Sequence, residues 1–415
     1  MKKPLHKHIG HHARKIHGHF TKYLYERDTI FATIWVFLFI IILGSIPLNL
    51  GVLNPIKLGL KDFDANDLSY SKLGKAKNTP IDKRIVIINI GQADREGLAM
   101  MIDKAAGMKP KVMALDVTFD GPKDPHQDSL ISETFRRNKN LIAARRLVLH
   151  GKDGDTISFA GDYIKTASQY AYVNFFNDPA STIRYYDPFL EDYAEKSYSS
   201  FSSEIVKAYD PEAFEKLEKR GHHHILINYT RHVSQYIVWN YEDLLEGNID
   251  DSAFFGKIIL FGYLNENPND IDDKKFTPMN ERFAGKSFPD MNGIVVHANI
   301  ISMALDNNYI KKLPSWVNWL IAVLVCWLFM SFFIRYYLES HIWFHLVAKI
   351  IQVASAILFV WFGIYLFDKY RLKVDMKMSL IVIVMAVDVI YFYEAWAVWM
   401  HKKFKYKTVF KPHHH

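Results

Sequence analysis

Four stretches of this sequence are apolar over about 20 residues each, the length at which a helix crosses the hydrocarbon core of a bilayer. The first stands alone near the beginning, and we interpret it as a retained anchor because it is too long and too far along the chain for a cleaved signal peptide. The other three follow one another near the end. The predicted segments are a basic, histidine-rich tail (1–28), four membrane helices (29–49, 315–334, 346–367 and 378–400), a large intervening domain (50–314) and a second basic tail (401–415).

Lysine and arginine beside these helices predict the orientation of the chain. Both tails are rich in them, and residues 401–415 contain no acid, so we expect both tails in the cytoplasm and residues 50–314 outside it. The loop at 368–377 opposes this orientation, since its four basic residues would face outward. We accept that local violation because the two tails agree. The basic residues of the tails are Lys2, Lys3, Lys7, Arg14, Lys15, Lys22, Arg27, Lys402, Lys403, Lys405, Lys407 and Lys411.

The net charge of +7 and the single cysteine bear on the class of function. The lysine excess lies in the tails, where it favours contact with anionic lipid headgroups over binding to nucleic acid. Cys326 lies inside an apolar stretch, and one thiol cannot form an intrachain disulfide, a zinc ribbon or an iron–sulfur cluster.

The chain also holds 19 histidines, and six of them lie in the first tail. We interpret these six as part of a flexible basic tail, with loose binding of zinc, nickel or copper as the alternative. His222, His223 and His224 precede a predicted strand, where a weak metal or pH response is the less favoured interpretation. Residues 413–415 belong either to the native tail or to a purification tag. We predict no metal site and no cofactor.

The large intervening region has the pattern of an α/β fold. Residues 83–115 predict a strand, a helix and a second strand, the size of a right-handed parallel crossover. Continuous apolar runs recur further on, as expected for strands buried on both faces. We therefore predict a mostly parallel sheet with flanking helices, joined to the first membrane helix by residues 50–78. The further strand runs are NLIAARRLVL, AYVNFF, HILINY, GKIILFGY and GIVVHANII, and the helical patterns are DSLISETFRRN, FSSEIVKAYD and AFEKLEKR.

In this order, the blocks of residues 84–314 resemble the type 2 CHASE family, extracytoplasmic sensory domains of bacterial receptor kinases and nucleotide cyclases. The most specific blocks are DDKKFTPM, with Asp273, Thr277 and Pro278, and NGIVVHAN, with Gly293, His297 and Asn299. The resemblance implies a sensory domain followed by three membrane helices, which agrees with the apolar pattern. The other matching blocks are RIVIINI, ALDVTFDG, YVNFFND, ILINY and GKIILFGY.

The sequence departs from this family pattern in two places. Gly91 and Gln92 stand where the family commonly has an acidic residue after the first strand, so an acid-dependent contact is not expected there. Residues 401–415 are too few for the kinase or cyclase that often ends such chains. We therefore expect a signal to leave through a separate partner protein.

Five polar residues are candidates for a ligand pocket: Asp116, Asp273, Thr277, His297 and Asn299. In a doubly wound sheet, ligands bind beyond the carboxyl ends of the strands, and a few directional polar groups among apolar walls make such a pocket. The alternative is that these side chains cap helices and pin loops through hydrogen bonds to the backbone. The chain has no GxSxG, GxGxxG, HExxH or phosphate-loop motif, so we predict no catalytic residues and no enzyme activity.

Three ionisable residues fall inside the predicted membrane helices: Lys349, Asp388 and Glu394. Such residues are costly in lipid and usually face protein or water. Counting residues along the helices puts Lys349 at the depth of Glu394, which predicts that these two pair. It leaves Asp388 either as a neutral acid or in a contact with another helix or subunit.

The sequence thus predicts a protein of the bacterial cytoplasmic membrane with an extracytoplasmic sensory domain and no output domain of its own. In one hypothesis, a small ligand biases that domain and the helices pass the change to a membrane or cytoplasmic partner. In the other, the chain is a non-enzymatic scaffold subunit of a cell-envelope complex. The ligand and the partner are not identified by the sequence, and a homo-oligomer is compatible with both hypotheses.

Overall fold

The computed structural model describes residues 23–45, 64–71, 79–150, 156–176, 182–192, 195–221, 224–265, 267, 270–280, 288–339 and 341–410. It divides into two compact units, residues 59–310 and residues 1–58 with 311–415, which we call the α/β unit and the helical unit. The predictions for the histidines of the first tail, for His222 and His223, for residues 413–415 and for most of the 50–78 connection lie outside the described residues.

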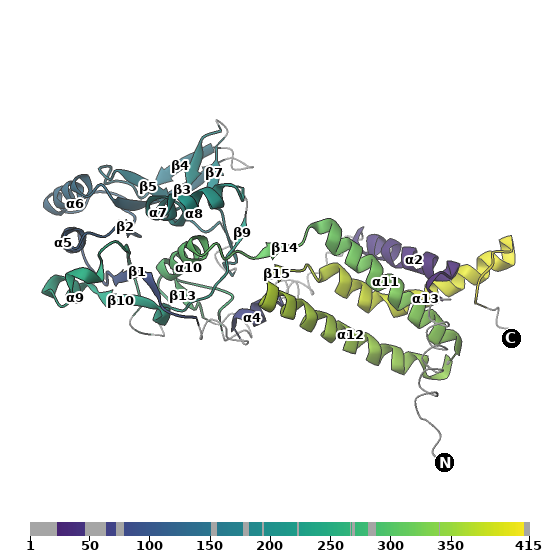
Figure 1. Cartoon of the computed structure of the whole chain (residues 1–415). Coiled ribbons are helices and arrows are strands. Elements are labelled where there is room, and N and C mark those ends of the chain that lie inside the picture. The colour runs from purple at the N-terminus through teal and green to yellow at the C-terminus, as the bar shows by residue number, and fades with distance from the viewer. Residues whose placement is uncertain are drawn as a thin grey trace, which may run out of the picture. The chain divides into compact units, whose positions relative to one another are not determined.

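A seven-stranded sheet forms the centre of the α/β unit (Figure 1). Neighbouring strands are parallel except for β4, which runs antiparallel to β3. This confirms the predicted mostly parallel sheet. Its order is β10 (Tyr236–Asn240), β1 (Asp82–Asn89), β11 (Ile258–Gly262), β2 (Val112–Leu115), β3 (Leu141–His150) and β4 (Thr156–Ala160), with β5 (Gln169–Tyr172) also beside β3.

Helices cover both faces of this sheet, which explains why its strands read as continuous apolar runs. Alternate residues of β1 enter opposite cores: Ile85 and Ile87 pack in one, Val86 and Ile88 in the other. The first core also takes side chains from α7 (Phe201–Tyr209), α8 (Pro211–Glu218) and α10 (Gly293–Leu305). The second takes side chains from α5 (Arg95–Gly107), α6 (Pro125–Arg137) and α9 (Tyr241–Glu246).

Short elements complete the unit beside this sheet. They form small two-stranded pairs and single turns at its margins. These are α4 (Asp67–Ser71), β6 (Tyr185–Tyr186), β7 (Phe189–Glu191), β8 (Ser197–Ser199), β9 (Ile225–Leu226), β12 (Lys274–Lys275), β13 (Met291–Asn292) and the 3₁₀ turns Val233–Gln235 and Asp251–Ala253.

Two of the predicted strands were wrong. The run GIVVHANII is helix α10, which packs between the sheet and helices α7 and α8 and is buried from Gly293 to Ala304. A helix covered on all sides has no polar face, so its short apolar run resembles a buried strand. The run HILINY contributes only the two residues of β9, which pair with β6 outside the central sheet. The edge strands β10 and β4 were missed.

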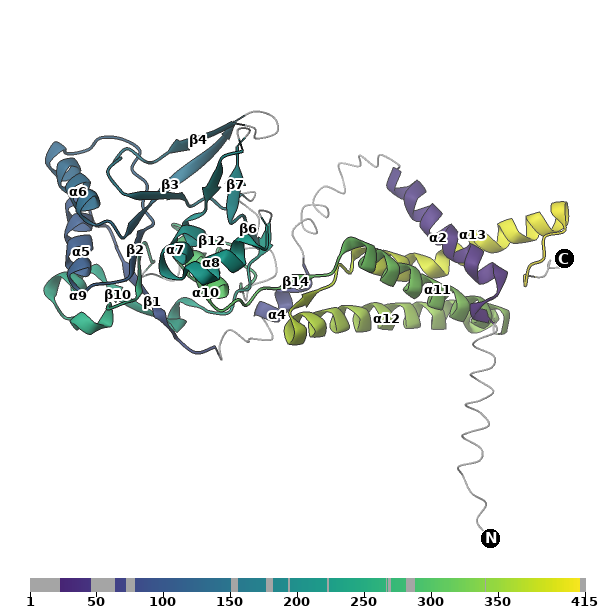
Figure 2. The same cartoon turned by 45° about the horizontal axis from the view of Figure 1, so that its top comes forward.

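The helical unit contains four long apolar helices (Figure 2). Three of them contain a predicted apolar stretch whole, and α2 contains the first stretch as far as Ser45, where the described residues pause. All four are long and apolar enough to cross a membrane. Two short strands pair in parallel, one before α11 and one after α12. The elements are α2 (Arg27–Ser45), β14 (Lys311–Lys312), α11 (Ser315–Glu339), α12 (His341–Tyr370), β15 (Leu372–Lys373) and α13 (Lys377–Phe404).

Helix α13 packs against each of the other three long helices. Its core residues include Val382, Ala386 and Tyr393, which lie among side chains of α2 and α11. The segment after α13 turns back at Lys405, whose φ is +54°, and buries Phe410 in the same core. The two chain segments that flank the bundle, at the start of α2 and after α13, are therefore packed against each other.

Candidate functional site

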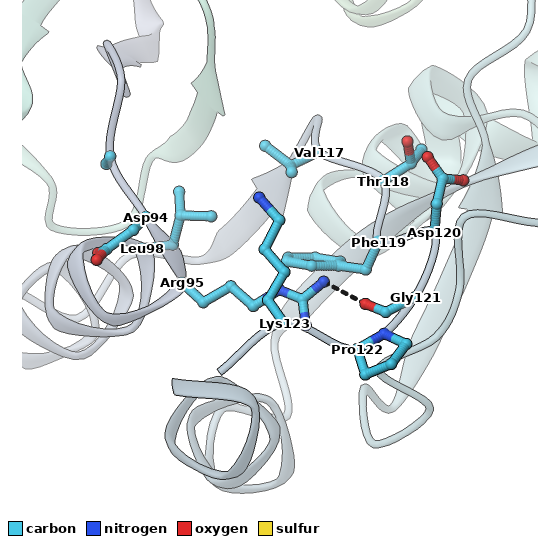
Figure 3. Close-up of a pocket in the computed structure, with 11 residues that line it drawn as sticks. Asp94, Arg95, Leu98, Val117, Thr118, Phe119, Asp120, Gly121, Pro122 and Lys123 are labelled. Atoms are coloured by element: carbon cyan, nitrogen blue, oxygen red, sulfur yellow. Dashed lines mark hydrogen bonds between the residues drawn. The ribbon is translucent and has the colours of Figure 1, made fainter. Parts of the chain in front are cut away.

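A cavity of about 300 Å³ opens at the carboxyl ends of β1 and β2 (Figure 3). The turn after β1 and the first turn of α5 form one wall, and residues 117–123, between β2 and α6, form the other. This is where a parallel sheet with helices on both faces is expected to bind ligands. Leu98, Val117 and Phe119 supply apolar lining, while Asp94, Arg95, Asp120 and Lys123 supply charged groups.

Arg95 holds the two walls together. Its side chain is 6% exposed, pairs with Asp128 at the start of α6 and donates from Nη2 to the Gly121 carbonyl at 2.6 Å. The guanidinium also lies 5.3 Å from the centre of the Phe119 ring, a cation–π contact visible in Figure 3. Asp128 accepts a further hydrogen bond from the Lys123 backbone N–H at 3.0 Å. Burial opposes the charge of Asp128, but these hydrogen bonds outweigh it and lower its pKa.

The start of α5 is fixed by Asp94. Its Oδ1 accepts from the Gly97 N–H at 2.9 Å, an N-cap, and its Oδ2 accepts from the Gln127 side chain at 2.7 Å. Both walls of the cavity are thus held by side chains that bridge α5 and α6. These bridges define the arrangement of the two walls in which the cavity is open.

The structure brings two of the five predicted pocket residues together. Asp116 follows β2 directly, and its neighbours include Asp273 and Lys275. Lys275 Nζ lies 3.5 Å from Asp273 Oδ1, and Asp273 Oδ2 accepts from the Gly293 N–H at the first turn of α10 at 3.2 Å. Burial, reinforced by the negative charge of Asp273 and opposed by Lys275, raises the pKa of Asp116 to about 7. The carboxyl of Asp116 therefore changes charge near neutral pH.

Thr277 lies in a separate contact. Its N–H and hydroxyl donate to the carboxylate of Asp290 at 2.7 and 2.5 Å. Burial raises the pKa of Asp290 to about 6, although the hydrogen bonds from Thr277 oppose that change. Thr277 and Asp290 together close the loop ahead of β13.

His297 and Asn299 lie within α10 and bind other parts of the unit. His297 Nδ1 is 2.9 Å from the Ser202 hydroxyl, and its ring stacks on Phe175. Burial lowers the pKa of His297 to about 3, so this imidazole is neutral at physiological pH. Asn299 accepts from the N–H groups of Thr230 and Arg231, both at 3.1 Å. These contacts match the alternative interpretation, in which polar side chains pin loops.

Sequence reasoning missed Arg95, the cavity it closes, and Lys275. The signal for Arg95 was its place: it opens the helix that follows the first strand, at the expected binding edge of the sheet. Lys275 stands in the quoted DDKKFTPM block but was not singled out. Within the described residues, no three His, Cys, Asp or Glu side chains come together as a metal site. His224 Nδ1 lies 2.9 Å from Asp187 Oδ1.

The predicted pairing inside the helical unit was wrong. Lys349 Nζ lies 2.9 Å from Asp388 Oδ1, whereas Glu394 accepts a hydrogen bond from the Tyr337 hydroxyl at 2.6 Å. The count of residues along each helix gave the wrong depth. The contacts His345–Tyr391, Lys349–Asp388 and Gln352–Ile383 place Lys349 level with Asp388. Glu394 lies further along α13 and faces Tyr337 of α11.

Comparison with known proteins gives one family. The family model of the CHASE2 domain matches residues 36–333, from within α2 to within α11, and so spans the whole α/β unit. No curated protein and no solved structure gives a significant match to the chain.

Proposed function

This chain belongs to the CHASE2 domain family, a family of sensory domains, and we propose that it is a membrane sensor whose α/β unit binds a ligand and passes its bound state to a partner protein. The proposal assigns it no reaction of its own. In this arrangement the four long helices cross the bacterial cytoplasmic membrane, the α/β unit lies outside the cytoplasm, and the basic tails lie inside against anionic lipid.

The observation that carries the proposal is the cavity at the carboxyl ends of β1 and β2. Its walls come from two separate loops, bridged by Arg95 and Asp128. A ligand that contacts both walls favours the arrangement in which they are bridged. A ligand shifts a conformational equilibrium only through such differential affinity.

The end of the signal path that we propose lies at Asp28, the second residue of α2. Its carboxylate is 1% exposed and accepts hydrogen bonds from the Tyr393 hydroxyl and from the Val409 N–H, both at 2.6 Å. A shift of α2 against α13 therefore changes the position of the segment after α13. That segment is the surface we assign to the cytoplasmic partner.

The test is ligand-dependent melting of the full chain in lipid nanodiscs, with a library of small metabolites and envelope fragments. Binding to the folded state raises the melting temperature. Val117→Phe fills the cavity and should abolish the shift, whereas Val148→Phe, an exposed valine of β3 outside the cavity, should keep it.

Two outcomes contradict the sensor proposal. One is a shift that survives Val117→Phe, which removes the ligand from this cavity. The other is the absence of any shift together with a stoichiometric complex recovered from native membranes. That second result supports the scaffold hypothesis instead.

A further inference from the structure

Helices α12 and α13 carry an ion pair on their outer surface. Lys349 Nζ lies 2.9 and 3.1 Å from the two carboxylate oxygens of Asp388, so each charge has one good partner. Yet the two side chains remain 53% and 51% exposed. The helices around them are long and apolar enough to cross a membrane.

More polar groups lie along the same line between the two helices, which we call the α12–α13 seam. One turn from the ion pair, the exposed His345 ring stacks on Tyr391, and the tyrosine hydroxyl lies 3.0 Å from His345 Nδ1. One turn the other way, Gln352 donates to the Ile383 carbonyl at 2.7 Å. His345, Lys349 and Gln352 are spaced four and three residues apart, so they share one face of α12.

Contact with lipid is unfavourable for the polar side chains of this seam. Charged groups in membrane helices face protein or water, because lipid supplies no hydrogen bonds to replace those of water. Most exposed side chains of α12 are apolar and suited to lipid, but Lys349 and His345 are not. The exposed apolar side chains are Trp343, Leu346, Ile350, Val353, Ile357, Leu358, Trp361 and Phe362.

We propose that the α12–α13 seam is a self-association interface and that a second copy of this chain covers it. The argument is charge complementarity. Each copy presents a cation and an anion side by side, so a copy related by a two-fold axis presents them in the reverse order. Lys349 of one copy then faces Asp388 of the other, and four charges form a closed ring. A partner with a single charge would leave one member of the pair uncovered.

The inference rests on the proposed membrane crossing of α12 and α13 and is independent of the ligand. Helix α12 is also placed for this role, because in Figure 1 it lies on the side of the bundle opposite α2. The polar side chains of the seam named above come from α12 and α13, so a second copy can approach them without displacing α2.

The experiment is charge-swap complementation with the full chain in dilute liposomes, using two tags and energy transfer between labelled copies. Lys349→Asp gives a seam with two acids, and Asp388→Lys gives one with two bases. Each variant alone repels its own copy, and we expect self-association to fall at least tenfold. Mixing the two variants sets acids against bases and should restore association between differently tagged copies.

Two control variants separate this result from misfolding. The double reversal, Lys349→Asp with Asp388→Lys, retains an internal pair and should associate as the parent chain does. Lys369→Asp, at the end of α12 and away from the seam, should leave association unchanged. The inference is overturned if the parent chain is monomeric in dilute liposomes, or if the single variants associate normally. It is equally overturned if the double reversal associates while the mixture does not.

Discussion

In the α/β unit the carboxylate of Asp67 is 4% exposed and is held by Arg184, which is itself 11% exposed. In the helical unit the carboxylate of Asp388 also has a cation within hydrogen-bond distance, at 2.9 Å, yet it is 51% exposed. These two ion pairs thus differ in what surrounds them rather than in whether they form. The α/β unit buries the Asp67–Arg184 pair within its own chain, whereas the Lys349–Asp388 pair lies exposed on apolar helices.

The helical unit is nevertheless able to bury an acid. Asp28 is 1% exposed, and its hydrogen bonds come from neutral donors, the Tyr393 hydroxyl and the Val409 N–H. The exposure of Asp388 therefore does not follow from a general failure of the bundle to enclose charge. It is a local property of the α12–α13 seam.

The largest predicted effect comes from removing one member of the buried Asp67–Arg184 ion pair. Arg184→Met removes the guanidinium that pairs with the buried Asp67, and we expect the α/β unit to lose about 3–5 kcal/mol of unfolding free energy. Denaturant unfolding of the full chain, followed by tryptophan fluorescence, measures this loss. Lys216→Met removes an exposed pair with Glu212 and should leave the unfolding midpoint where it was. A loss below about 1 kcal/mol for Arg184→Met would contradict the inferred role of burial.

The second prediction concerns Asp116, whose pKa is raised to about 7 from the 3.8 of an exposed aspartate. Between pH 4 and 7 the folded chain binds this proton and the unfolded chain does not, so stability falls as pH rises through that window. Asp116→Asn cannot ionise and should flatten the decline, on the order of 2–4 kcal/mol between pH 4 and 8. Melting at several pH values measures the difference.

Lys275 provides the matched test for that prediction. It lowers the pKa of Asp116, so Lys275→Met should raise this pKa further and move the decline in stability to higher pH. If both variants keep the parent pH profile, the Asp116 carboxyl is not the titrating group.

The third prediction tests the buried acid of the helical unit. Asp28→Ala removes the acceptor for Val409, so the segment after α13 should detach at a cost of about 2 kcal/mol. Trypsin should then cleave after Lys405 and Lys407 at least tenfold faster than in the parent chain. Asp28→Asn keeps one acceptor oxygen, so its cleavage rate should lie between those of Asp28→Ala and the parent chain. Equal cleavage rates for Asp28→Ala and the parent would show that other contacts hold this segment.

Much of the fold was predictable because its signals are local. The four long helices are recognisable from the length and apolarity of their sequences. Residues Ile85 to Ile88 form one apolar run because both faces of the sheet are covered. Helix α10 was not recognised, since its burial on all sides depends on contacts with α7, α8 and the sheet that no local pattern encodes. The family resemblance, in contrast, was confirmed because it rests on the order of several blocks.

The site was predictable only in part, for a related reason. The rule that ligands bind beyond the carboxyl ends of parallel strands found Asp116, because a residue that ends an apolar run can be located in the sequence. It did not find Arg95, which is an ordinary first-turn residue until its partner Asp128, 33 residues away, is known. Asn299 was assigned to the pocket because the sequence does not reveal its hydrogen-bond partner Arg231, which lies 68 residues away. Contacts over such separations are set by packing.

The smallest predicted effect compares two buried serines, one in each unit. Ser202 and Ser331 are both 1% exposed, but Ser202 bonds His297, whereas Ser331 Oγ has no hydrogen-bond partner among the described residues. Ser202→Ala should cost about 1 kcal/mol, because it leaves the ring nitrogen of His297 unpaired in the core. Ser331→Ala should cost close to nothing, since it removes a hydroxyl that gains nothing there. Melting both variants at pH 7 and 8.5 checks the difference, which should be the same at the two values because His297, with its pKa lowered to about 3, is neutral at both. Equal costs for the two serines would contradict the inferred difference in their hydrogen bonding.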